Sequence, residues 1–220
     1  MQILGIVDIH SKTDQIEDLL AEAEDADLVL VAGDITNFGV DDRAEAVLKP
    51  LIEVSKRIFA VTGNCDYGEV DGYLERLDLH LEGKPRSVGG IRIIGVGGSL
   101  PCPSSTPHEH SEEELKILLE EQMEEGGAGE PLIAVIHQPP FGTKIDKSLL
   151  AGHVGSEAVR TFIEEYQPLL CFSGHIHESP GIDTLGESVL VNPGPFLKGR
   201  YFLADINDGK VQIELKSLMS

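Results

Sequence analysis

A chain of 220 residues with 41% hydrophobic residues is long enough for one α/β domain, and we expect a single domain over residues 1–220. Its 17 basic and 38 acidic residues give a net charge of −21, which disfavours extended binding to nucleic acid. No apolar run approaches the roughly 18 residues of a membrane span, the three scattered cysteines form no disulfide framework, and no signal peptide precedes the first strand, so we expect a cytoplasmic protein without membrane contact.

Strands and helices alternate in the first third of the chain. Apolar runs predict strands at 2–7, 27–32 and 57–61. Between them we expect a helix over 41–55 and an earlier helix that Thr13 N-caps, with an apolar face made of Ile16, Leu19, Leu20 and Ala23. Helix-length segments between buried-type strands imply βαβ crossovers and a largely parallel sheet.

The rest of the chain mixes parallel and antiparallel patterns. We expect short strands at 79–81 and 91–96 around a Gly-rich turn, a loop at 97–107, a helix over 112–125 that Gly126-Gly127 ends, a strand at 132–136, a helix over 156–166 and a strand at 169–172. The pattern at the end of the chain predicts antiparallel strands at 181–185, 188–191, 201–206 and 211–215, with turns at Gly186 and Asp208-Gly209. Two stacked sheets with outer helices account for this order.

Several short segments carry metal-binding side chains. They are Asp8-Ile9-His10, Gly33-Asp34, Gly63-Asn64-Cys65-Asp66, the single His137, and Gly174-His175-Ile176-His177. Each lies just beyond the C-terminal end of a predicted strand, where ligands bind in open α/β sheets. Taken alone, each has an ordinary explanation in turn chemistry. The ordered set favours a metal site, because all of those explanations would have to hold at once.

The donor set indicates the kind of metal. Oxygen and nitrogen donors without a thiolate requirement suit Mn²⁺, Fe, Zn²⁺, Ni²⁺ or Co²⁺ rather than Ca²⁺. Our first choice is a pair of Mn²⁺ ions. Two divalent ions a few ångströms apart can bind a phosphate ester, generate a hydroxide at neutral pH and stabilise the leaving oxygen.

In order and spacing, these segments resemble the five blocks of calcineurin-like metallophosphoesterases, and Asn192-Pro193-Gly194 resembles the terminal turn of small prokaryotic members. The resemblance implies an α/β fold: a four-layer αββα sandwich of two mixed sheets flanked by helices. It also implies a dinuclear centre in which Asp8, His10 and His177 hold one metal, Asn64, His137 and His175 hold the other, and Asp34 bridges both. The implied reaction is in-line attack of a metal-bridging hydroxide on a small phosphate ester, a phosphodiester rather than a monoester.

One position departs from the family pattern. Many members carry His where this chain has Cys65, and that His stabilises the transition state or protonates the leaving oxygen. A thiol is a poorer proton donor near neutrality, so we expect weaker assistance to the leaving group. A covalent role for Cys65 is disfavoured because no His-Asp relay accompanies it. We expect Asn64 to contact the phosphate as well as a metal, and Asp66 to orient ligands by hydrogen bonds.

Two other functions within the family stay open. A non-catalytic metal-binding scaffold would suit the acidic surface and Cys65, but it would have no reason to keep all seven ligands. A nuclease of the double-strand-break-repair type would need a basic surface, which this chain lacks. Homo-oligomerisation and the natural substrate stay open. The roles of five further residues also stay open: His108, His110, His153, Lys198 and Arg200. We expect the histidines to lie in exposed loops, and we expect Lys198 and Arg200 to form salt bridges.

Overall fold

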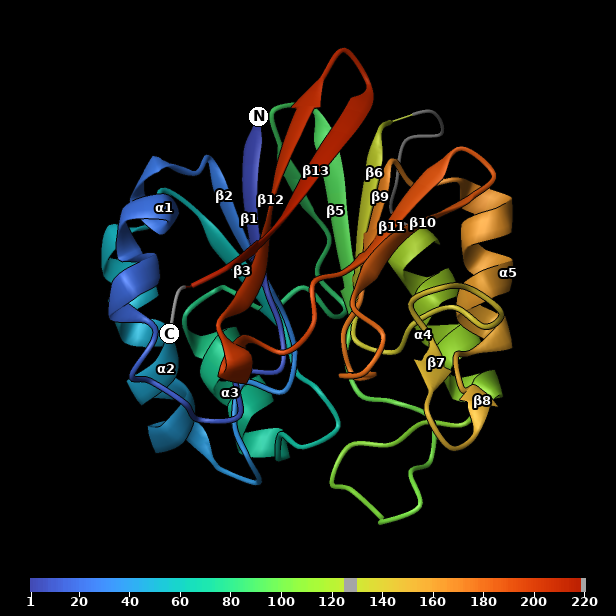
Figure 1. The fold of residues 1–220 in the computed structure, drawn as a ribbon, viewed down its shortest axis with the longest axis horizontal. Coiled ribbons are helices and arrows are strands. Elements are labelled where there is room, and N and C mark those ends of the chain that lie inside the picture. The colour runs from blue at the N-terminus through green and yellow to red at the C-terminus, as the bar shows by residue number, and fades with distance from the viewer. Residues whose placement is uncertain (125–129, 219–220) are drawn as a thin grey trace.

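A computed structural model describes residues 1–124 and 130–218, which form two mixed sheets stacked face to face (Figure 1). The first sheet has the strand order β13-β12-β1-β2-β3. Its strands are β1 (Gln2–Ile6), β2 (Leu28–Ala32), β3 (Ile58–Val61), β12 (Arg200–Asn207) and β13 (Lys210–Ser217). The three parallel strands β1, β2 and β3 are joined to an antiparallel pair, because β12 runs antiparallel to both β1 and β13.

The second sheet has the strand order β10-β11-β9-β6-β5-β4. Its strands are β4 (Arg86–Val88), β5 (Ile91–Val96), β6 (Leu132–Ile136), β9 (Leu170–Phe172), β10 (Gly181–Leu185) and β11 (Ser188–Asn192). The four central strands are parallel, and the two edge strands β4 and β10 are antiparallel to their neighbours. A separate hairpin pairs β7 (Lys147–Ser148) with β8 (Gly152–His153).

Helices cover the outer faces of both sheets (Figure 1). On the first sheet they are the short 3-10 helix η1 (Glu17–Leu19), α1 (Leu20–Asp25), α2 (Asp41–Val54) and α3 (Gly68–Arg76). On the second they are α4 (Glu112–Glu124) and α5 (Glu157–Tyr166). A further 3-10 helix, η2 (Phe196–Lys198), precedes β12. Among the described residues, no helix is long and apolar enough to cross a membrane.

Three apolar layers hold the fold together, and the alternation of side chains along each strand supplies them. In β2, Val29 and Val31 pack against the helices, whereas Leu28 and Leu30 pack between the sheets. The third layer lies between the second sheet and α4 and α5. Because neighbouring strand residues point to opposite faces, a strand that is apolar throughout must be covered on both sides. The predicted αββα sandwich is confirmed.

Aromatic packing closes the space between the sheets. Phe172 of β9 and Phe202 of β12 are fully buried and meet edge to face, with ring centroids 4.8 Å apart. Gly5 is the partner of Phe202 in the β1–β12 register, and a Cβ atom there would overlap the Phe202 ring. The glycine thus lets the ring lie across β1.

Some predicted elements are wrong. Thr13 caps no helix: its carbonyl accepts a bond from the Ile16 N–H, and the first helical turn starts at Glu17 without a side-chain cap. Residues 79–81 form only a single bridge, from His80 to Ala60, and the antiparallel neighbour of β5 is β4 instead. The predicted helix stop at Gly126-Gly127 lies outside the described residues.

Helix α3, the β7–β8 hairpin, β4 and the 3-10 helix η2 were not predicted. Helix α3 contains two glycines, which weaken its intrinsic helix propensity. Burial of Val70, Tyr73 and Leu74 against the first sheet's helical layer stabilises it instead. The β7–β8 hairpin has strands of two residues each, too short for a periodic pattern.

Replacing Phe172 by Ala should lower the free energy of unfolding by about 3–5 kcal/mol, because truncating a fully buried ring leaves a cavity. Chemical denaturation followed by circular dichroism measures the change. The control Tyr166→Ala removes a ring that is 37% exposed on α5 and should cost much less. Equal losses for the two variants would contradict the packing between the sheets.

Candidate metal centre

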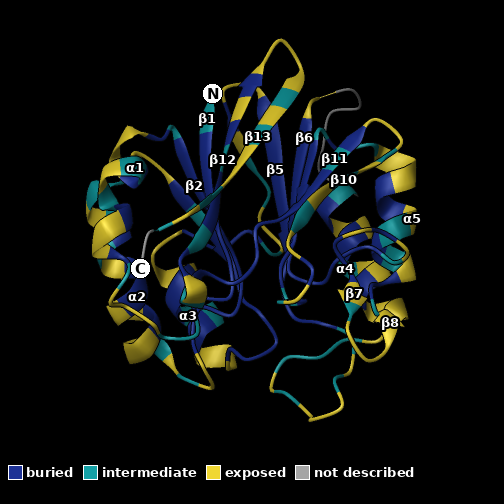
Figure 2. Ribbon diagram, in the orientation of Figure 1, coloured by how far each residue is buried: buried dark blue, intermediate teal, exposed yellow. Residues whose placement is uncertain are grey.

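The metal-binding segments meet at one edge of the two sheets. Three of them follow β1, β2 and β3, and two follow β6 and β9. Parallel strands place their carboxyl ends together, so the first sheet contributes three loops and the second contributes two. Figure 2 shows that the loops just beyond these strands are largely buried. The two sheets therefore present polar side chains to one shared, water-poor space.

One group of ligands lies on the side of the first sheet. Donor atoms of Asp8, His10, Asp34 and His177 all lie within 4.8 Å of one another. His10 Nε2 is 3.6 Å from Asp34 Oδ2, His177 Nε2 is 3.6 Å from Asp8 Oδ1, and the two Nε2 atoms are 3.2 Å apart. Oδ2 of Asp8 is buried and has no hydrogen-bond partner among the described residues. A buried carboxylate oxygen without a donor fits a cation at this position.

A second group surrounds His137. Nδ1 of His137 lies 2.7 Å from the Ala32 carbonyl oxygen, an acceptor that keeps the proton on Nδ1. Nε2 then carries a lone pair, yet it faces Asn64 Oδ1 at 3.1 Å and Asp34 Oδ1 at 3.6 Å, which are also acceptors. The His175 ring lies beside it, with centroids 5.3 Å apart. Acceptors that face one another in a buried space fit a second cation.

The environment keeps three of the imidazoles and one carboxylate in the forms that bind metals. Burial lowers the pKa of His10 and of His137, and it lowers the pKa of His175 to about 3. Burial would raise the pKa of Asp8, but the nearby His177 and His137 bring it below its ordinary value. These three imidazoles are neutral and Asp8 is ionised near neutrality, as coordination requires.

Strained backbone aims the ligands. Asp8, His10, Asp34 and His175 all have positive φ, from 47° to 65°. Hydrogen bonds between the loops hold this geometry: the His10 N–H donates to the Asp34 carbonyl at 2.9 Å, and the Asp8 N–H donates to the Gly33 carbonyl at 3.1 Å. Left-handed backbone at non-glycine residues is uncommon and gathers at functional sites.

The loop after β3 must come close to Asp34. A Cβ atom on Gly63 would overlap both the backbone nitrogen and the carboxylate of Asp34. Only glycine therefore lets Asn64 approach the first group of ligands.

Comparison with known proteins identifies the family. The family model for calcineurin-like phosphoesterases matches residues 1–179. The chain belongs to the calcineurin-like phosphoesterase family. It is 34% identical over 224 residues to the uncharacterized protein MJ1162 of Methanocaldococcus jannaschii, covering 97% of this chain and 96% of that protein.

Solved structures share the fold. The crystal structure of TT1561 of Thermus thermophilus is similar with a TM-score of 0.78 and 20% identity over 97% of both chains. Phosphopantetheinyl hydrolase PptH of Mycobacterium tuberculosis is similar with a TM-score of 0.61 and 13% identity over 88% of both chains. The family depends on divalent metals, and the first group of ligands forms a candidate metal-binding cluster.

In this calcineurin-like phosphoesterase, Asp66 ties the ligand loops together. Its carboxylate accepts hydrogen bonds from the N–H groups of Ile35, Thr36 and Gly63 and from the Thr36 hydroxyl, at 2.7–3.1 Å. Burial and the Asp34 charge raise the pKa of Asp66 to about 6. Through these bonds, both carboxylate oxygens of Asp66 contact the loops that follow β2 and β3. The part that Asp66 plays in the reaction stays a prediction.

Cys65 lies between the ligands as a neutral thiol. Its N–H donates to Asp34 Oδ1 at 2.8 Å, and its Sγ is 3.6 Å from Asn64 Nδ2. Burial and the Asp34 charge raise the pKa of Cys65 far above its ordinary range. A protonated thiol is a weak nucleophile, so the geometry gives no support to covalent chemistry at Cys65.

Sequence reasoning missed Cys102. Its Sγ lies 3.9 Å from His175 Nε2 and 4.0 Å from Asn64 Nδ2, so a second thiol borders the ligands. The residue comes from the loop after β5, which folds back across the strand ends. Nothing in its local sequence, a Pro- and Ser-rich loop, signals this position.

The other residues left open lie outside the ligand groups. His108 and His110 are half-buried rather than exposed, because their rings pack edge to face and His108 Nδ1 lies 3.2 Å from the Thr62 hydroxyl. His153 is exposed but sits in β8, with Nδ1 2.6 Å from Asp146 Oδ1. Lys198 and Arg200 make no ion pair with any described residue, contrary to the salt bridges expected for them.

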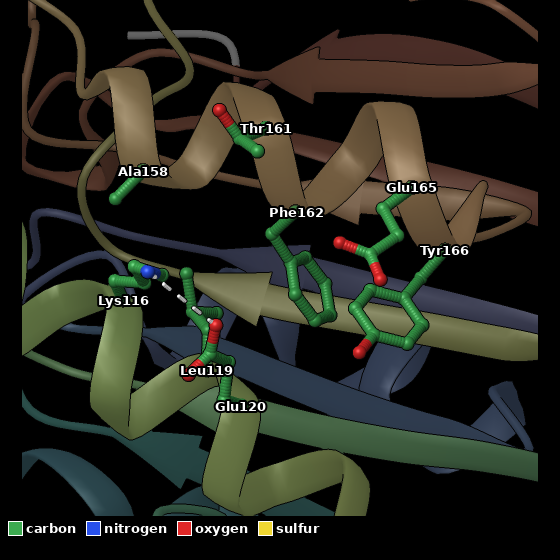
Figure 3. A pocket seen from close by; sticks show the side chains of 8 residues that line it. All are labelled: Lys116, Leu119, Glu120, Ala158, Thr161, Phe162, Glu165 and Tyr166. Carbon is green, nitrogen blue, oxygen red and sulfur yellow. Dashed lines mark ion pairs between the residues drawn. The ribbon is translucent and has the colours of Figure 1, made fainter.

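A groove of about 280 Å³ lies between α4 and α5 (Figure 3), and none of the candidate metal ligands lines it. Leu119, Phe162 and Tyr166 line it, and the ion pair Lys116–Glu120 spans 3.9 Å at its side. It holds no histidine and no group of converging carboxylates, so it is not a candidate for hydrolysis.

Asp34→Asn should stabilise the metal-free protein at pH 7.5 and remove most of its stabilisation by Mn²⁺. Burial and the Asp8 charge raise the pKa of Asp34 to about 6 in the folded chain, against about 3.9 when unfolded. The contribution of this group therefore favours folding below pH 4 and is lost as the pH rises through 6. At pH 7.5 the buried charge costs up to about 3 kcal/mol, which Asn avoids.

Thermal unfolding with EDTA or with Mn²⁺ checks this prediction. The metal-free variant should melt above the wild type at pH 7.5 and close to it at pH 4. If Mn²⁺ stabilised the variant as strongly as the wild type, Asp34 would not lie between two ions.

Proposed function

We propose that this chain is a dinuclear metal-dependent phosphoesterase that hydrolyses small phosphodiesters. One observation carries the proposal: the two oxygens of Asp34 face different groups of ligands. Oδ2 lies 3.6 Å from His10 Nε2, and Oδ1 lies 3.6 Å from His137 Nε2. A carboxylate in this position suits a bridge between two ions. On this proposal Asp8, His10 and His177 complete one site, and Asn64, His137 and His175 complete the other.

The protein's own groups would bind and orient the ester. A pair of divalent ions, when bound, supplies an activated water at neutral pH and positive charge for the phosphoryl oxygens. Asn64 Oδ1 faces His137, so its Nδ2 projects the other way and can donate a hydrogen bond to a phosphoryl oxygen. Cys65 and Cys102 border that amide nitrogen and offer only weak S–H donors.

Charge favours a diester over a monoester. A phosphomonoester carries nearly two negative charges at pH 7, and a diester carries one. The ligand groups include two carboxylates and no lysine or arginine, within a chain of net charge −21. Two bound divalent ions would offset these carboxylates, so the field that opposes a second negative charge on the substrate comes from the acidic rest of the chain. Mn²⁺ is the proposed ion, because mixed carboxylate, amide and imidazole donors suit it.

The last strands bear on domain organisation. β12 and β13, from the end of the chain, complete the sheet that β1 starts. We accordingly propose that residues 1–220 act as one domain. We propose separately that the protein works in the cytoplasm.

With Mn²⁺, the protein should hydrolyse bis(p-nitrophenyl) phosphate with a higher kcat/KM than p-nitrophenyl phosphate. His137→Ala should reduce kcat/KM by about 100-fold or more, since even partners that only orient metal ligands contribute 10–100-fold. The matched control is His153→Ala, which removes an exposed imidazole away from the ligands and should leave activity unchanged. Metal bound without turnover of either ester would favour the scaffold.

Cys65→His should improve turnover of diesters with poor leaving groups, because an imidazole near neutrality can protonate the departing oxygen by general acid catalysis, worth about 10²–10⁴-fold. A series of substituted phenyl esters measures the dependence of kcat on leaving-group pKa, which should become shallower. Cys65→Ser keeps the size of the side chain and should keep the steep dependence. An unchanged slope in a folded, metal-loaded Cys65→His protein would contradict this role for the position.

A further inference from the structure

Phe38 has an unusual conformation for an aromatic residue. Its φ is 54°, in the left-handed region that bulky side chains rarely adopt, and half of it (50%) is exposed to solvent. Packing of a fully buried aromatic ring could offset the free-energy cost of such strain, but a half-exposed ring contributes little packing energy. The observation points to a use outside the folded core.

Hydrogen bonds hold this conformation in place. The Phe38 N–H donates to the Cys65 carbonyl at 3.1 Å, and the Asn37 N–H donates to the Ser11 hydroxyl at 3.1 Å. On the other side of Phe38, the Gly39 N–H donates to the Thr36 hydroxyl at 3.1 Å. The loop is thus fixed to the segments that follow β1 and β3. A ring on such a rigid frame loses little entropy when it binds a ligand.

The backbone of Phe38 is linked by hydrogen bonds to the loops that carry the candidate ligands. Phe38 follows Asp34 by four residues, and its backbone partner Cys65 donates its own N–H to Asp34 Oδ1 at 2.8 Å. Tyr67, two residues beyond Cys65, is also 42% exposed. Two exposed aromatic residues therefore flank the loop that carries Asn64.

We propose that Phe38 is a specificity residue that stacks on the nucleobase of a small nucleotide phosphodiester. This inference rests on the proposed function and names its substrate class. Aromatic rings stack on any base, and the exposed amide of Asn37 beside Phe38 can bond a base edge. The net charge of −21 opposes long polyanions, so the substrate is mono- or dinucleotide in size.

Adenosine monophosphate and ribose 5-phosphate test the proposal, because the second carries a hydroxyl group where the first carries the base. As competitive inhibitors of Mn²⁺-loaded protein, adenosine monophosphate should bind about tenfold more tightly. Phe38→Ala should bring the two inhibition constants together, whereas Tyr166→Ala, which removes an exposed ring on α5, should keep them apart. Equal inhibition constants in the wild type would overturn the proposal while leaving phosphodiester hydrolysis intact.

Fluorescence gives a readout that does not depend on turnover. The chain has no tryptophan, so Phe38→Trp and Tyr166→Trp each carry a single reporter. Adenosine monophosphate should quench the first and not the second, and ribose 5-phosphate should quench neither. Equal responses of the two reporters, or none, would refute the stacking.

A stability measurement separates this role from a structural one. Phe38→Gly should melt at a higher temperature than Phe38→Ala, since glycine adopts positive φ without strain, yet both should lose discrimination between the two inhibitors. Discrimination retained in either variant would show that the Phe38 ring does not contact the base.

Discussion

The structure depends on how two buried carboxylates and their imidazole neighbours share one largely buried space. Asp8 and Asp34 are both almost fully buried, and one oxygen of Asp8 has no donor among the described residues. Burying such groups without compensation is costly. The nearby His177 and His137 bring the pKa of Asp8 below its ordinary value, but the pKa of Asp34 stays raised to about 6, so the imidazoles do not remove the whole cost. Divalent cations would. The same charges that burden the metal-free fold would therefore favour metal at this candidate site, and Asp34, which faces both groups of candidate ligands, would couple the two sheets through it.

The fold can accept this cost because its stability comes from elsewhere. Three continuous apolar layers lie on both sides of the sheets, and they extend into the ligand loops only through single residues such as Ile9 and Ile35. At the strand ends, four ligands adopt left-handed backbone, each at a cost on the order of 1–3 kcal/mol. Asp66 and the contact between Gly63 and Asp34 hold these loops in place. The strand ends of a stable sandwich thus form a rigid frame for a strained site. Phe38, in the loop after β2, has positive φ like the four candidate ligands.

The sequence allowed prediction where a signal is local and repeated. The strands β1, β2, β3 and β6 are short apolar runs, and the polar residue that follows each is visible at once, so the placement of the ligands at strand ends was predictable. Features that depend on distant contacts were not. Helix α3 forms despite two glycines because it packs against the core. Residues 79–81 make only a single bridge, to Ala60 of β3, and Cys102 reaches His175 only through the path of a long loop. The exposure of Phe38 and its positive φ are likewise properties of the folded loop.

A crystal structure of the Mn²⁺-loaded protein, with anomalous scattering recorded at the manganese edge, tests the central claim most directly. The account predicts two anomalous peaks a few ångströms apart, one bound by Asp8, His10 and His177, the other by Asn64, His137 and His175, with Asp34 contacting both. A single peak, or ions bound away from Asp34, would contradict it.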